Sequence, residues 1–102
     1  MKLPDRIKIG SLVFDVVVIK GLLDSDKSKI LNGHIKYNDS KILIEEEQHD
    51  TVKRLTVLHE VIHGIATYAC LEQPLSESDV ERITNLLAAV LADNPELLDL
   101  WR

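Results

Sequence analysis

The chain has little of what several classes of function require. Its one cysteine, Cys70, excludes an internal disulfide, and its aromatic residues are only 4% of the sequence, which leaves little surface for stacking on bases or sugars. Lysine and arginine number 12 against 17 acidic residues, for a net charge of -5, so there is no basic stripe of the kind that follows nucleic-acid phosphates. We therefore expect neither a nucleic-acid partner nor binding to an anionic membrane.

Long apolar runs are also missing from the sequence. The longest, Val16–Ile19 and Leu86–Ala92, fall far short of the roughly 20 residues that a membrane-spanning helix needs. The first residues lack the apolar stretch of a secretory signal peptide, and a lone cysteine is typical of a reducing compartment. These features predict a cytoplasmic protein with no membrane partner, and they leave its oligomeric state open.

The apolar residues that are present suffice for one core. Of the 102 residues, 45% are hydrophobic and 28% are charged, so we expect residues 1–102 to form a single domain. The first half alternates between apolar and polar positions in the manner of strands, and residues 22–33 are expected to form a loop. The acidic run Glu45–Glu47 is expected to be solvated. Strands are expected at residues 6–10, 12–19, 34–37 and 41–45.

The second half repeats with the spacing of helices. Apolar residues recur every three or four positions, which predicts one helix from residue 50 or 51 to about residue 71. A second helix is expected from a cap at Ser76 or Ser78 through Ala92. It is apolar on nearly all sides over Leu86–Ala92, so we expect other elements to enclose it. The predicted fold is α+β, with a mostly antiparallel N-terminal sheet of about four strands packed on two helices.

The most specific pattern, H-E-x-x-H, falls inside the first expected helix at residues 59–63. Positions four apart share one face of a helix, so His59 and His63 can both direct a ring nitrogen at one ion about 2.0–2.1 Å away. Glu60 is rotated by roughly 100° from His59 and can reach a water on that ion without binding the ion. The motif predicts His59 and His63 as ligands of one Zn²⁺ per chain, with Glu60 as the catalytic general base.

A catalytic zinc site needs a third protein ligand and one open position. We expect Glu81 to be this ligand, because it begins a narrow face of small residues on the second helix that can approach the first helix closely. Ser78 and Glu81 also have the spacing of a capping box, in which the glutamate would bond a backbone amide instead. The alternative ligands are Glu77 and, after it, Asp79, Glu72 or a further histidine.

The motif and its surroundings resemble the zincin metallopeptidases, and among them the gluzincins, whose third ligand is a downstream glutamate. More closely, the chain resembles the small phage and mobile-element proteins of the ImmA/IrrE-like metallopeptidase family. That resemblance extends over residues 33–95 and rests on residues 33–37, 41–44, 56–63, 80–82 and 91–95. It implies a zincin-like fold and a zinc-dependent endopeptidase. It also implies that the strand before the motif helix, here Ile42, Leu43 and Ile44, pairs with an extended polypeptide substrate.

Two other functions are compatible with the same residues. A zincin scaffold that keeps its metal or its peptide groove but cuts nothing would be a binding module. A fourth protein ligand, for which Cys70 and His49 are the candidates, would close the coordination sphere and make the metal structural. An open sphere with turnover distinguishes the peptidase from both alternatives.

Overall fold

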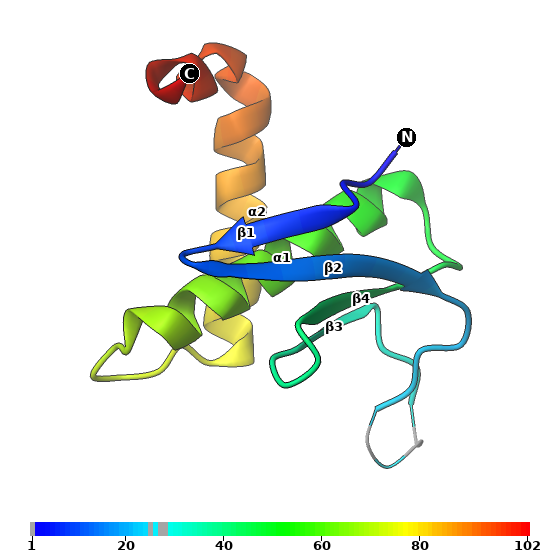
Figure 1. Ribbon diagram of the computed structural model, residues 1–102. Coiled ribbons are helices and arrows are strands. Elements are labelled where there is room, and N and C mark those ends of the chain that lie inside the picture. Colours follow the sequence, from blue (N-terminus) through cyan, green and yellow to red (C-terminus); the bar gives the residue numbers. More distant parts are fainter. Residues whose placement is uncertain (1, 25, 27–28) are drawn as a thin grey trace.

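The computed structural model of the chain describes residues 2–24, 26 and 29–102 (Figure 1). Its strands are β1 (Arg6–Ile9), β2 (Leu12–Ile19), β3 (Gly33–Lys36) and β4 (Lys41–Glu45), and its helices are α1 (Asp50–Ala69), α2 (Glu77–Asp93) and the 3₁₀ helix η1 (Pro95–Trp101). The α+β class predicted from the sequence is confirmed. Residues 25 and 27–28 of the expected loop lie outside the described residues. No described helix combines the length and the apolar character needed to cross a lipid bilayer.

The four strands form one mixed sheet in the order β1-β2-β4-β3. The outer pairs, β1 with β2 and β3 with β4, are antiparallel, as expected, whereas the central pair of β2 and β4 is parallel. Alternation within a strand does not encode its direction relative to a distant neighbour, so the sequence could not reveal this parallel pair. As a result, β4 has a partner on each side and β3 forms an edge of the sheet.

The core lies between the sheet and α1. Phe14, Ile42 and Ile44 are fully buried, and Ile9 and Ile35 join them in one cluster. These side chains come from alternate strand positions and therefore face the same side, where α1 contacts β1, β3 and β4. A glycine in α1 allows this close approach, because a Cβ at Gly64 would lie 2.7 Å from Ile9 Cδ1. The motif helix is therefore held firmly against the sheet.

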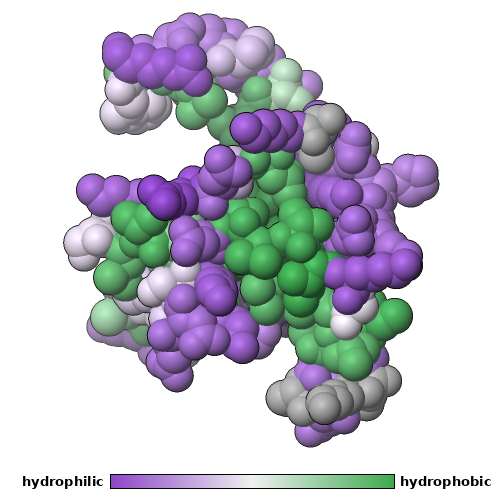
Figure 2. Space-filling view, turned by 45° about the vertical axis from the view of Figure 1, so that its right-hand side comes forward, coloured by the Kyte–Doolittle hydropathy of each residue, from purple (hydrophilic) through white to green (hydrophobic). Residues whose placement is uncertain are grey.

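The second helix, α2, crosses α1 on the side away from the sheet (Figure 1). Within the described part of the chain, α2 contacts α1 and η1 but no strand. Val80 and Thr84 are buried, whereas Leu86 and Val90 are 70% and 44% exposed. The expectation that other elements enclose Leu86–Ala92 is therefore wrong, because only one side of this half, with Ala88 and Leu91, faces α1. Figure 2 shows the C-terminal segment standing clear of the body, and apolar side chains across the middle of the visible face.

The side chain of Glu45 links the segment before β3 to the sheet by hydrogen bonds. Its side chain is buried, and its Oε1 accepts hydrogen bonds from the N–H groups of Gly21 and Leu22, both at 2.8 Å. Its Oε2 accepts a further bond from the N–H of Glu47 at 3.1 Å. Bonds from backbone N–H groups, that of Glu47 foremost, lower the pKa of Glu45. The expectation of a solvated acidic run is wrong at this residue, because its partners Gly21 and Leu22 lie far back in the chain.

Candidate metal centre

Helix α1 directs two histidine rings at one point. His59 and His63 are four residues apart in the helix, and their Nε2 atoms lie 3.1 Å from each other. Their side chains are 17% and 27% exposed, so both rings are partly covered and still accessible from solvent. This is the arrangement that the spacing of the motif predicts.

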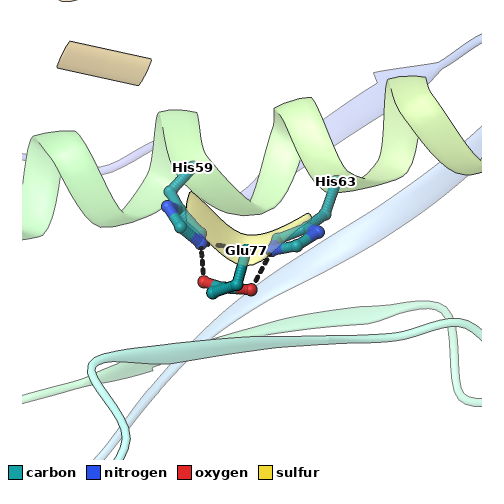
Figure 3. A group of neighbouring side chains, drawn as sticks. All are labelled: His59, His63 and Glu77. Atoms are coloured by element: carbon teal, nitrogen blue, oxygen red, sulfur yellow. Dashed lines mark hydrogen bonds and ion pairs between the residues drawn. The ribbon is translucent and has the colours of Figure 1, made fainter. Parts of the chain in front are cut away.

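Helix α2 adds a carboxylate at the same point (Figure 3). Glu77 Oε1 lies 2.5 Å from His59 Nε2, and Glu77 Oε2 lies 2.9 Å from His63 Nε2. Among the described residues, these three form the one group of side chains whose potential ligand atoms lie within 4.8 Å of one another. The three residues together could hold a metal ion.

Glu81, which we expected as the third ligand, lies outside this group, and Glu77 takes that place. The two glutamates are four residues apart on one face of α2, so a pattern of helix faces cannot separate them. Which of the two glutamates reaches the histidines depends on the point at which α2 crosses α1, and tertiary structure sets that point.

The N-terminus of α2 fixes the position of Glu77. Asp79 N–H donates to Ser76 Oγ at 3.0 Å, and Ser76 N–H donates to Asp79 Oδ2 at 3.1 Å, which forms a capping box. The bond from the Ser76 N–H lowers the pKa of Asp79. The box that we considered for Ser78 and Glu81 is therefore not the one present. With Ser76 as the cap, Glu77 is the first helical residue, where the helix dipole favours a negative charge.

Glu60 lies next to the histidine pair but faces the sheet. It is buried, and its Oε1 accepts a hydrogen bond from the Ile35 N–H at 3.1 Å. Burial raises the pKa of Glu60, although positive charge on His59 and His63 and the Ile35 N–H act in the opposite direction. A carboxylate made more basic in this way is a better proton acceptor.

The strand edge nearest the site belongs to β3. In an antiparallel pair, the backbone N–H and C=O groups of successive residues point alternately toward the partner strand and away from it. The Ile35 N–H bonds Glu60, so the backbone groups of Ile35 and Gly33 are those that point away from β4. The expected docking strand, with Ile42, Leu43 and Ile44, has no free edge, because β4 pairs with β2 and β3. The expectation that a peptide pairs with these residues is therefore wrong. The strand order of the sheet places β3, and not β4, at the edge.

A pocket of about 350 Å³ opens beside His59, Glu60 and Glu77. Its volume is near the lower end of the ~300–1,000 Å³ that is common for small-molecule sites. Glu81 reaches the candidate site as part of the lining of this pocket. The full lining is Leu31, Asn32, Gly33, Val52, Leu55, Thr56, His59, Glu60, Glu77, Glu81, Thr84 and Asn85.

Neither candidate for a fourth ligand joins the group. Cys70 and His49 are both exposed, and in the described residues neither belongs to the cluster that contains Glu77. His49 instead occupies the N-cap position of α1, where its side chain makes no capping bond. The potential ligands among the described residues are therefore three, and two of them, His59 and Glu77, also line a pocket.

Comparisons with family models, curated proteins and solved structures found no match to this chain. Its function is therefore inferred from the residues and geometry of the chain itself. The features that carry it are the three converging donor groups, the buried Glu60, the free edge of β3 and the adjoining pocket.

Proposed function

We propose that this protein is a zinc-dependent endopeptidase with a zincin-like fold of the gluzincin type, as its resemblance to the ImmA/IrrE-like metallopeptidases implies. His59, His63 and Glu77 are the metal ligands, and Glu60 is the general base. The observation that carries the proposal is the convergence of two imidazole nitrogens and one carboxylate beside a buried second carboxylate. Three such ligands with one position left open are typical of catalytic zinc.

The distances between the donor atoms support one zinc ion per chain. Tetrahedral bonds of 2.0–2.1 Å place ligand atoms about 3.3 Å apart. The two Nε2 atoms lie 3.1 Å apart, and each is in contact with one oxygen of Glu77, at 2.5 Å from His59 and 2.9 Å from His63. The carboxylate would therefore have to move outward to admit the ion. Two imidazoles and one carboxylate are also a donor set that suits Zn²⁺.

The chain supplies the groups that hydrolysis of a peptide bond needs. When bound, Zn²⁺ provides Lewis acidity that polarises a carbonyl and favours deprotonation of water. Glu60 accepts the proton of the attacking water and delivers it to the amine nitrogen as the C–N bond breaks. The Ile35 N–H holds Glu60 Oε1 at 3.1 Å, so the carboxylate keeps its orientation during both transfers.

An extended polypeptide is the substrate class that fits the free edge of β3. A peptide lying along Gly33 and Ile35 would form main-chain hydrogen bonds with the outward-facing groups of this edge other than the Ile35 N–H, which already bonds Glu60, as in strand addition generally. Such bonds do not depend on side chains, so they provide affinity and orientation for many sequences. Because Ile35 also bonds Glu60, the same strand would place the peptide next to the general base.

Zinc-dependent cleavage of an unfolded polypeptide tests this proposal. Protein stripped by a chelator and reloaded with one equivalent of Zn²⁺ should cut the polypeptide, and the stripped protein should not. His63→Ala should be inactive, whereas His49→Ala, which changes an exposed histidine outside the group, should retain activity. Stoichiometric zinc without cleavage would identify a binding module, and cleavage by the stripped protein would contradict the proposal.

A further inference from the structure

The pocket beside the candidate metal centre combines two kinds of surface. Leu31, Val52 and Leu55 provide apolar side chains from α1 and from the segment before β3. Helix α2 contributes polar groups, among them Glu81 and Thr84. An elongated side chain that is apolar along its length and polar at its end would match both surfaces.

Glu81 is the carboxylate in this pocket for which the described residues provide no partner. Of the other acids in the lining, Glu60 accepts a bond from Ile35, and Glu77 contacts both histidines. Glu81 makes no hydrogen bond or ion pair with the described residues, and no lysine or arginine is present in the lining. A bound divalent cation would balance the charges of Glu60 and Glu77 and leave the charge of Glu81 uncompensated.

We propose that this pocket selects a lysine or arginine side chain next to the scissile bond, with Glu81 as the residue that determines this specificity. This inference rests on the proposed peptidase function and names its substrate class. The aliphatic stem of the substrate residue packs against Leu55 and Val52, and its cationic head bonds the Glu81 carboxylate. The pocket adjoins His59 and Glu60, so a side chain held there places its own peptide bond at the centre.

Peptides with lysine or acetyl-lysine at one position test the role of charge, because acetylation removes the charge and keeps the long side chain. Binding is measured by fluorescence anisotropy on zinc-loaded Glu60→Gln protein, which avoids turnover. Cleavage is measured by mass spectrometry on wild-type protein. We expect the lysine peptide to bind at least about tenfold more tightly than its acetylated form, and to be cut next to the lysine. Glu81→Gln should abolish this preference, whereas Glu72→Gln, which changes an exposed acid outside the pocket, should keep it.

The outcomes separate the inference from the function on which it rests. Equal affinity for the two peptides, or an unchanged preference in Glu81→Gln, would overturn the role of the pocket, while zinc-dependent cleavage would still support the peptidase. Loss of zinc from Glu81→Gln would make Glu81 a metal ligand and also overturn the inference. If zinc-loaded protein neither cut nor bound any peptide, both proposals would be overturned.

Discussion

The two helices that form the candidate metal centre are held in different ways. Helix α1 packs on three strands, and its residues His59, Glu60 and His63 are buried or half-buried. Helix α2 contacts only α1 and η1 within the described residues, and the side chain of its Glu77 is 70% exposed. Two of the proposed ligands and the proposed general base are thus fixed by the core, whereas the proposed third ligand depends on one helix crossing. A metal ion shared by the two helices would strengthen that crossing.

The largest effect on activity is expected from the α1 side of the centre. Glu60→Gln should retain zinc, because Glu60 is not in the ligand group, and should reduce kcat by about 10²–10⁴-fold through loss of the base. Metal analysis together with steady-state cleavage rates measures both quantities. A variant that cuts at the wild-type rate would remove Glu60 from the mechanism.

The α2 side is tested by comparing its two glutamates. Glu77→Ala should weaken zinc binding by more than about 100-fold, since even partners of ligands typically contribute 10–100-fold. Glu81→Ala should keep an affinity close to that of wild type, because Glu81 lies outside the ligand group. Competition with a chromophoric chelator gives both affinities. The reverse order would return Glu81 to the role that the sequence suggested.

The two halves of α2 should also differ in their contribution to stability. Val80 is fully buried, so Val80→Ala should lower the free energy of unfolding by about 2 kcal/mol. Leu86 is largely exposed, so Leu86→Ala should change it by no more than about 0.5 kcal/mol. Urea denaturation of the apo proteins compares them. A large loss for Leu86→Ala would mean that the outer half of α2 is covered in solution.

The smallest effect is expected from the pH dependence of the stability that Glu45, at the end of β4, provides. Its folded pKa lies below its unfolded value of 4.5, so its stabilisation is present above that value and is lost as the pH falls through the folded pKa. The stability difference between wild type and Glu45→Gln should therefore shrink as the pH falls below 4.5 and through the lowered folded pKa of Glu45. Glu46→Gln, at the exposed neighbouring position, is the control. A difference that does not change with pH would contradict the role of the backbone bonds.

The sequence revealed the parts of this site that depend on local geometry. His59 and His63 face the same way because four residues make about one helical turn, and Glu60 is placed by the same rule. Glu77, the proposed third ligand, was ranked below Glu81 because Glu81 begins a narrow face of small residues, and a pattern of helix faces does not separate the two glutamates. The cap at Ser76 with Asp79 three residues later was the available signal, since it makes Glu77 the first residue of α2.

The features that were missed all depend on contacts between distant segments. The order of β3 and β4 in the sheet decides which strand has a free edge, and the alternation of Ile42 and Ile44 does not encode that order. Burial of Glu45 depends on N–H groups in the segment after β2, so its acidic neighbours suggested the wrong environment. The apolar outer half of α2 suggested enclosure, but the tertiary structure leaves Leu86 and Val90 exposed.

The most direct test of the account is the metal content of the purified protein and of two histidine variants. Wild type and His49→Ala should each contain about one zinc per chain by elemental analysis, because the three proposed ligands are intact in both. His59→Ala should contain almost none, and its Tm should not rise when Zn²⁺ is added, whereas that of wild type should rise. Equal zinc in wild type and His59→Ala, or no zinc binding by wild type, would contradict the proposed metal centre.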